Sequence, residues 1–171
     1  MLFFIKTAMK KNTNHGFTLI EVLLAVFIFM VGISSLSITI NMAVSSITET
    51  KSKLIASYLA QEGIEIVRNI RDSNWLVQRD NPGFAWDSGL ALGDYEADYQ
   101  NQALLGYAGR YLNSDGNGFY SYSAGTATKF KRKIAISDKT ANSLKVSSRV
   151  DWEVRTRPYN IEVVEYLYNW K

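Results

Sequence analysis

The stretch GFTLIEVLLA, residues 16–25, decides how this chain is organised. It opens a run from Phe17 to Thr48 in which Glu21 is the one charged residue, and residues 22–33 are almost wholly apolar. About 20 apolar residues in an α-helix, at 1.5 Å per residue, span the hydrocarbon of a bilayer. The sequence therefore predicts a membrane-crossing helix over residues 17–47.

Three basic residues, Lys6, Lys10 and Lys11, precede this helix without any acid among them. The positive-inside rule places such an N-terminus in the cytoplasm and the rest of the chain outside. Without these three, the 19 basic residues become 16, which equals the 16 acidic residues. The chain after residue 16 is formally neutral, so net charge gives no argument for nucleic-acid binding.

Glu21 is the unusual residue of the apolar run. A carboxylate in a membrane helix costs roughly 2.5–3.5 kcal/mol on insertion scales, and such residues usually have a partner. Cleavage after Gly16 would create an α-amino group on Phe17, about one helical turn (roughly 6 Å) from Glu21. That amine could neutralise Glu21 of its own chain or of a neighbour. The alternative is that Glu21 lies at the bilayer interface.

The basic leader, the Gly-Phe pair, the Glu at the fifth position after the Gly and the long apolar run resemble the class III signal of type IV pilins and type II secretion pseudopilins. The resemblance implies that a prepilin peptidase cuts after Gly16 and methylates Phe17, and that Glu21 docks the subunit onto a filament. It also implies other pilin subunits, an assembly platform and its ATPase as partners. Membrane lipid surrounds the helix before assembly.

The leader, residues 1–16, opens MLFFI, whereas pilin leaders are generally short and polar. A start at Met9 would give a more typical leader. Two other interpretations of the N-terminus remain. An ordinary secretory signal could be cut near residues 43–45, although the apolar stretch is too long and contains Glu21. A plain signal anchor would give no reason for Gly-Phe or for Glu21.

The chain has no cysteine, and its one histidine, His15, lies in the leader. Disulfides, thiolate metal sites and Ser-His-Asp or Cys-His catalysis are thereby excluded. A Ser-Lys or carboxylate-pair enzyme is the alternative that the composition leaves open. We expect a protein that is not an enzyme and needs no cofactor.

No proline occurs before Pro82, so the helix should continue beyond the membrane to about residue 73. Residues 48–75 form its predicted amphipathic half, and Gly32 and Gly63 are the predicted soft points, where the whole helix could bend. One broad face carries large apolar residues: Ile47, Leu54, Ile55, Tyr58, Leu59, Ile66, Val67 and Ile70. The stretch 56–76 is also similar to a subset of minor-pilin-like prepilins.

Residues 76–125 are rich in turn residues and match the place of the variable loop in pilins. Within them, Asn113, Asp115 and Asn117 alternate as in a calcium loop, and some pseudopilins hold calcium in a loop. The twelfth position, however, is Ala124 rather than Glu, and Asp-Gly and Asn-Gly are common hairpin turns. The pattern favours a turn, with calcium as the alternative.

Residues 126–171 alternate apolar and polar side chains. This alternation predicts three antiparallel strands, which begin at about residues 129, 144 and 159. The predicted fold class is α+β, a pilin-like arrangement with one long helix packed on a three- or four-stranded antiparallel sheet. Residues 129–171 contain ten basic and five acidic residues. With Trp152 and Tyr166 nearby they could bind DNA, although core packing explains the aromatic residues better.

Three hypotheses of function follow. The first is a structural subunit, a minor pilin or pseudopilin, of an envelope filament. The second is a filament-borne adhesin or DNA receptor, and the third is an anchored envelope protein without a filament role. On the first, the protein is a single-pass cytoplasmic-membrane protein until it enters a surface or periplasmic filament.

Overall fold

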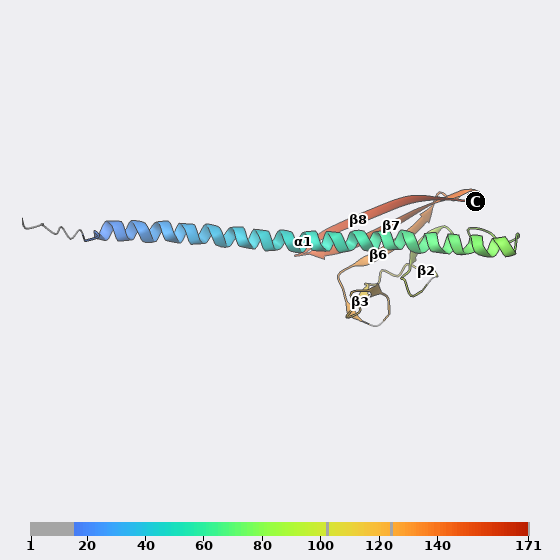
Figure 1. The fold of residues 1–171 in the computed structure, drawn as a ribbon, viewed down its shortest axis with the longest axis horizontal. Helices are drawn as coiled ribbons and strands as arrows, with labels where there is room; N and C mark the ends of the chain where they lie inside the picture. Colours follow the sequence, from blue (N-terminus) through green and yellow to red (C-terminus); the bar gives the residue numbers. More distant parts are fainter. Residues whose placement is uncertain (1–15, 102, 124, 171) are drawn as a thin grey trace, which may run out of the picture. The chain divides into compact units, whose positions relative to one another are not determined.

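The computed structural model describes residues 16–101, 103–123 and 125–170, so the predicted leader lies outside the described residues except for Gly16. The chain divides into two compact units, residues 1–46 and residues 47–171, and the second is called the head below. Helix α1 (Leu19–Asp80) is followed by the strands shown in Figure 1. These are β1 (Gly93–Glu96), β2 (Leu105–Gly106), β3 (Asn113–Ser114), β4 (Tyr120–Ser121), β5 (Thr126–Ala127), β6 (Lys131–Ser137), β7 (Ser143–Val154) and β8 (Arg157–Tyr168).

The strands form a five-stranded sheet in the order β2-β1-β6-β7-β8 and a small three-stranded sheet in the order β4-β3-β5. All of their pairings are antiparallel. The predicted α+β class, a long helix on an antiparallel sheet, is confirmed. The main sheet is larger than the predicted three or four strands, because β1 and β2 come from the region predicted to be a loop and continue the sheet beyond β6.

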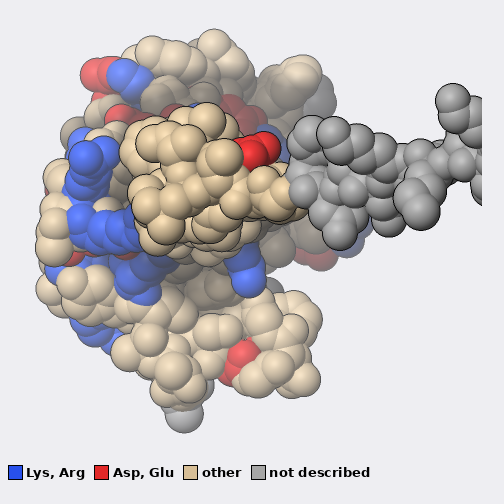
Figure 2. Space-filling view, turned by 90° about the vertical axis from the view of Figure 1, so that its left-hand side faces the viewer, with Lys and Arg blue, Asp and Glu red and all other residues tan. Residues whose placement is uncertain are grey.

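The alternation of residues in β6 and β7 places one face of the sheet against the core of the head. Strand β7 points Leu144, Val146 and Val150 inward, and all three are fully buried. Its outward positions include Lys145 and Arg149, and Figure 2 shows Lys and Arg side chains gathered on one side of the molecule. The sheet thus has an apolar inner face and a charged outer face.

The head half of α1 packs with a face that overlaps the predicted one and is rotated from it: Leu59 and Val67 are buried as predicted. Its buried positions centre on Ala56, Ala60 and Gly63, while Leu54 and Tyr58 are 55% and 63% exposed. Small residues let the helix backbone approach the sheet closely. A Cβ added at Gly63 would lie 2.2 Å from Oγ of Ser148 on β7. The prediction weighted large apolar side chains and therefore misplaced the contact face by part of a turn.

The helix ends at Asp80, seven residues after the predicted Ser73. Packing supports the additional turns. The amide of Asn74 donates to the carbonyl oxygens of Trp86 (3.0 Å) and Ser88 (2.8 Å), and Nε1 of Trp75 donates to Asn169 (3.3 Å). Tertiary contacts therefore carry the helix close to Pro82, where proline would interrupt it.

Two buried charged side chains hold the loop region onto the core. Glu96 is fully buried; its carboxylate accepts hydrogen bonds from the backbone N–H groups of Ala108 (3.1 Å) and Arg110 (2.9 Å), and it pairs with the Arg110 guanidinium. Arg132 is also fully buried; it donates to the carbonyl oxygens of Leu59 and Ala97 and pairs with Glu62 at 3.1 Å. Each buried charge is therefore met by partners within the head, as burial requires.

Candidate processing and assembly site

The peptide bond between Gly16 and Phe17 lies before the first helical residue, Leu19, and outside regular secondary structure. Both residues are exposed, with the Phe17 side chain at 81%. A Cβ added at Gly16 would meet no atom within 4 Å. The bond is therefore reachable by an enzyme, and no packing constraint of the described residues requires glycine at position 16.

Thr18 caps the N-terminus of α1. Its carbonyl oxygen accepts from the N–H groups of Glu21 (3.1 Å) and Val22 (3.2 Å), and its hydroxyl oxygen lies 3.4 Å from the Glu21 nitrogen, as a helix-capping threonine does. The sequence analysis did not identify this role. The pattern Thr-x-x-Glu at residues 18–21 is the signal that could have indicated it.

The Glu21 side chain stands in the first turn of α1 and is exposed. The backbone N–H of Glu21 is satisfied by Thr18, but among the described residues its carboxylate has no hydrogen-bond donor or cation as a partner. The positive end of the helix dipole favours a carboxylate here. The arrangement leaves Glu21 available to a positive group from another molecule or to an amine created at Phe17.

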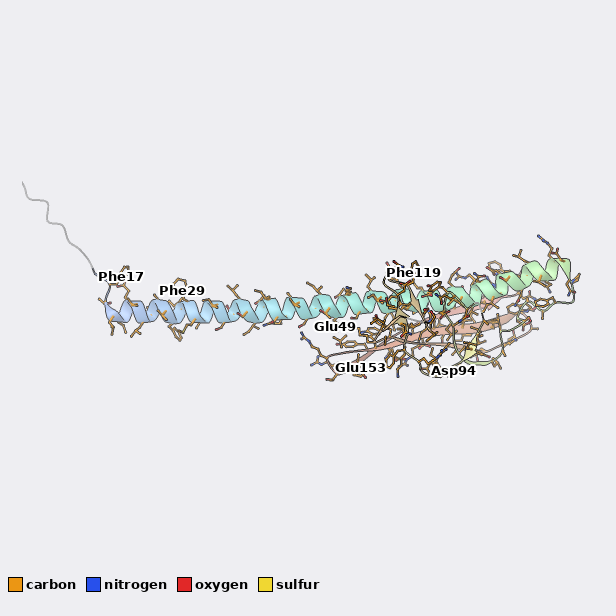
Figure 3. All side chains as sticks on the ribbon, turned by 90° about the horizontal axis from the view of Figure 1, so that it is seen from below. Phe17, Phe29, Glu49, Asp94, Phe119 and Glu153 are labelled. Atoms are coloured by element: carbon orange, nitrogen blue, oxygen red, sulfur yellow. The ribbon has the colours of Figure 1, made fainter. Side chains whose placement is uncertain are left out.

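The helix following Glu21 exposes its large apolar side chains. Phe27, Phe29 and Met30 are each more than 60% exposed, and Figure 3 shows Phe17 and Phe29 pointing outward from the ribbon. Among the described residues, one helix, α1, is long enough and apolar enough to cross a membrane. Together with the N-terminal motif reported below, it supports a membrane-anchored single-pass protein.

Hydroxyl groups in this apolar segment are satisfied within the helix itself. Ser34 donates to the Met30 carbonyl oxygen at 2.8 Å and Ser37 to that of Ile33 at 3.1 Å. Ser35, Thr39 and Ser45 bond to backbone carbonyls in the same way. Such back-bonding lets serine and threonine enter a hydrocarbon environment without an unpaired donor.

Gly32 and Gly63, the predicted soft points, both lie inside unbroken helix. Around Gly32 a Cβ would meet nothing within 4 Å, whereas Gly63 is closely packed against Ser148 and Arg132. A packing role therefore explains Gly63, and flexibility at either glycine stays a prediction.

The three calcium candidates serve a turn. Oδ1 of Asp115 accepts from the N–H groups of Asn117 (3.0 Å) and Phe119 (2.9 Å), and the Asn113 amide donates to the Ser123 carbonyl oxygen at 2.6 Å. Ala124 lies outside the described residues. These bonds fit the predicted hairpin turn between β3 and β4, and calcium binding stays a prediction.

The two aromatic residues considered for DNA binding lie in different environments. Trp152 is 4% exposed and stacks on Tyr159 with ring centres 5.7 Å apart, inside the core. Tyr166 is 50% exposed on β8. Trp152 is therefore a core residue and is not available to stack on a base.

The prokaryotic N-terminal methylation motif, as a family model, matches residues 11–37. This motif is typical of type IV pilins and pseudopilins, and the long N-terminal helix on antiparallel sheets is pilin-like. The chain is thus prepilin-like, with a signal of the kind that a prepilin peptidase processes. Comparison with curated proteins and with solved structures gave no match.

Proposed function

We propose that the chain is a structural subunit, a minor pilin or pseudopilin, of a type IV pilus-like or type II secretion-like filament. The observation that carries this proposal is the methylation motif over residues 11–37, which contains an exposed Gly16–Phe17 bond and a Glu21 carboxylate without a partner among the described residues. The proposed activity is assembly, and the chain performs no turnover.

Processing prepares the assembly step. A prepilin peptidase adds water across the Gly16–Phe17 bond, which releases the leader with a Gly16 carboxylate and leaves an ammonium group on Phe17. Methylation of that nitrogen keeps its positive charge. The ammonium group of one subunit then pairs with Glu21 of its neighbour, which removes the cost of an isolated carboxylate in an apolar environment.

Assembly replaces lipid contacts with protein contacts. Before assembly the apolar segment lies in the cytoplasmic membrane, with the N-terminus in the cytoplasm and the head outside. An assembly platform and its ATPase lift the subunit out, and the apolar helices of neighbouring subunits pack together in the filament. The exposed apolar side chains of residues 17–47 supply the surface for both states.

The test is the mass of the N-terminus. The full chain is produced with and without a prepilin peptidase, and its N-terminal peptide is identified by mass spectrometry. We expect a mature start at Phe17 that carries one methyl group when the peptidase is present. An uncut chain, or a start near Ser46, would reject the proposal.

Gly16→Val is the matched control for this test. Position 16 has open space, so the substitution leaves the described structure undisturbed. We therefore expect the variant to fold and insert as the parent chain does but to remain uncut. The comparison separates recognition by the peptidase from a general folding defect.

A further inference from the structure

Six basic residues of the head gather at one end of it and form what we call the basic end surface. Lys51, Lys53, Arg155 and Arg157 are exposed, and Lys129 and Lys131 are half-buried. They come from three places in the sequence: the start of the head half of α1, the entry to β6, and the turn between β7 and β8.

Contacts between α1 and β8 show that the start of the head half of α1 and the turn between β7 and β8 lie at the same end of the head. A hydrogen bond with Glu49 raises the pKa of Tyr159 near the start of β8. Farther along, Arg68 pairs with Glu165, and Trp75 bonds to Asn169. Strand β8 therefore runs beside α1 in the same direction, which places the preceding turn, residues 155–156, at the end of the head where α1 enters it.

The entry to β6 lies at the same end. The ammonium group of Lys129 donates to Oγ of Ser52 at 2.6 Å. Lys131 lies over the ring of Tyr111 at 4.3 Å, and both lysines line a cavity of about 600 Å³ together with Tyr159. The surface is thus tied together by contacts that are internal to the head.

The charge of this end is strongly unbalanced. Within the described part of the chain, none of the six basic residues takes part in an ion pair. The nearby acids are Glu49, Glu153 and Asp151, and Asp151 is paired with Arg149 at 2.8 Å. Figure 3 shows Glu49 and Glu153 at this end of the head. Six cations against two unpaired acids leave a local positive field.

The position of two of these basic residues in the sequence indicates the partner of the basic end surface. Lys51 and Lys53 follow Thr48, the last residue of the charge-free stretch, by three and five residues. That stretch begins at Val22, and its helix is roughly 40 Å long at 1.5 Å per residue, which exceeds the roughly 30 Å of bilayer hydrocarbon. A helix longer than the hydrocarbon tilts, which brings the flanking residues close to the headgroups.

We infer that the basic end surface binds the phosphate groups of anionic phospholipids while the subunit waits in the membrane. This inference rests on the proposed membrane-anchored state and adds to it a lipid-dependent resting position of the head. Lysine and arginine side chains near a membrane surface are attracted to anionic lipids within about one Debye length, 8–10 Å. The exposed turn at residues 155–157 is the part placed to reach them.

Single-stranded nucleic acid is the other polyanion with this chemistry, and the structure favours it less. Binding of single strands relies on exposed aromatic residues on which bases stack. At this end Trp152 and Phe130 are buried, at 4% and 3% exposure; Tyr111 is 51% exposed, and the ammonium group of Lys131 lies over one face of its ring. Lipid phosphate needs no such stacking surface.

The test uses the absence of cysteine from the chain, which allows a single label to be placed. Full-length Thr156→Cys is spin-labelled in the turn and reconstituted in nanodiscs of phosphatidylcholine, or of equal parts phosphatidylcholine and phosphatidylglycerol. Collision with a water-soluble nickel complex is then measured. We expect accessibility at least threefold lower in the phosphatidylglycerol discs, and no change for a label at Asn81→Cys.

Two double variants in the labelled chain test whether Arg155 and Arg157 cause the difference in accessibility between the two lipids. Arg155→Gln with Arg157→Gln should abolish the difference between the two lipids. Arg79→Gln with Lys145→Gln removes the same charge, and Lys145 lies roughly 34 Å from residue 155 along β7; this control should retain the difference. A circular-dichroism spectrum confirms that each variant folds.

Equal accessibility in both lipids would overturn the inference, as would a lipid effect that both double variants retain. A gel shift of labelled single-stranded DNA that depends on Arg155 and Arg157, without a lipid effect, would overturn it in favour of nucleic acid. The N-terminal mass at Phe17 is measured on the same preparation, so failure of the lipid inference is distinguishable from failure of the filament proposal.

Discussion

The two units of this chain differ in whether particular charged side chains have partners within the same unit. In residues 16–46, Glu21 is exposed among apolar side chains, and its carboxylate has no partner among the described residues. In the head, Glu96 and Arg132 are fully buried, and each is met by several groups of the same unit. The head pairs these two buried charges with its own groups, whereas among the described residues the Glu21 carboxylate is left without a partner. Folding energy explains the first pattern, and the proposed assembly step would use the second.

Removal of the Glu21 charge should have the largest effect. Glu21→Gln keeps the shape of the side chain and removes the charge that, in the proposed assembly, pairs with the Phe17 ammonium of a neighbour. We expect incorporation into filaments, measured in sheared and sedimented material, to fall by about a hundredfold. That factor corresponds to about 2.7 kcal/mol, within the cost of an intramembrane carboxylate.

The substitution Glu21→Gln should leave the stability of the head unchanged. Cleavage after Gly16 and the unfolding midpoint of the head should equal those of the parent chain. Glu65→Gln is the matched control on the same helix, because Glu65 is exposed and its partner Arg68 keeps Glu165. Filament yield unchanged in Glu21→Gln would refute the view that the N-terminal unit is organised for assembly.

The close packing of the head predicts the next effect. In Gly63→Ala the new Cβ would lie 2.2 Å from Oγ of Ser148 and 3.2 Å from Cδ of Arg132, so the buried side chains must shift. Alanine favours helix by about 1 kcal/mol over glycine, but overpacking costs 1–3 kcal/mol. We expect a net loss of about 1 kcal/mol, measured by denaturant unfolding of the full chain in detergent micelles.

Ser148→Ala provides the matched rescue. The Ser148 hydroxyl is buried and has no hydrogen-bond partner among the described residues, so its removal alone should be neutral or stabilising. In combination with Gly63→Ala it should restore most of the lost stability. Gly32→Ala, where a Cβ meets nothing, should cause no loss, and equal losses at both glycines would remove the contrast between the units.

The sequence was sufficient for the features that depend on local pattern. The apolar run ahead of Thr48 predicted the membrane-crossing helix, and strict alternation in residues 144–155 predicted β7. The Gly-Phe pair and Glu21 were identified from their resemblance to a class III signal, and the motif match covers them.

Features that depend on long-range contacts were not predictable in this way. Strand β1 is four residues long, and its pairing with β6 joins residues about 40 positions apart in the chain. Glu96 resembles any solvent-exposed acid until the Arg110 backbone is seen to bond to it. The helix face was only partly assigned, because alanine and glycine contribute little apolar area but permit close approach of backbones.

Alkaline pH should weaken the head. Burial raises the pKa of Tyr122 from 10.0 to about 12, and its hydroxyl donates to the Arg132 carbonyl oxygen at 3.2 Å. A folded-state pKa above the unfolded one means that the folded head holds the proton more tightly. This stabilisation is fully present below pH 10 and is lost as pH rises toward 12.

We expect the free energy of unfolding to fall by about 1 kcal/mol over that range, less than a two-unit shift would give, because part of the ring reaches solvent. Unfolding at pH 9 and pH 11.5 measures it. Tyr122→Phe should lose this part of the pH dependence while other tyrosines keep theirs. A Tyr122→Phe profile identical to that of the parent chain would contradict the assignment.

The smallest expected effect is the loss of the helix cap at Thr18, near the start of the N-terminal unit. Thr18→Ala removes the capping hydroxyl but keeps the backbone carbonyl that accepts from Glu21 and Val22. Loss of a threonine cap costs about 0.5–1 kcal/mol, and the long 3.4 Å contact places this cap at the lower end. Hydrogen exchange at the Glu21 amide, in the full chain reconstituted in nanodiscs, should quicken by two- to threefold while head amides stay unchanged. Thr18→Ser retains a hydroxyl and should behave like the parent chain. If alanine and serine exchange alike, the hydroxyl has no capping role, and the first turn is held by backbone bonds alone.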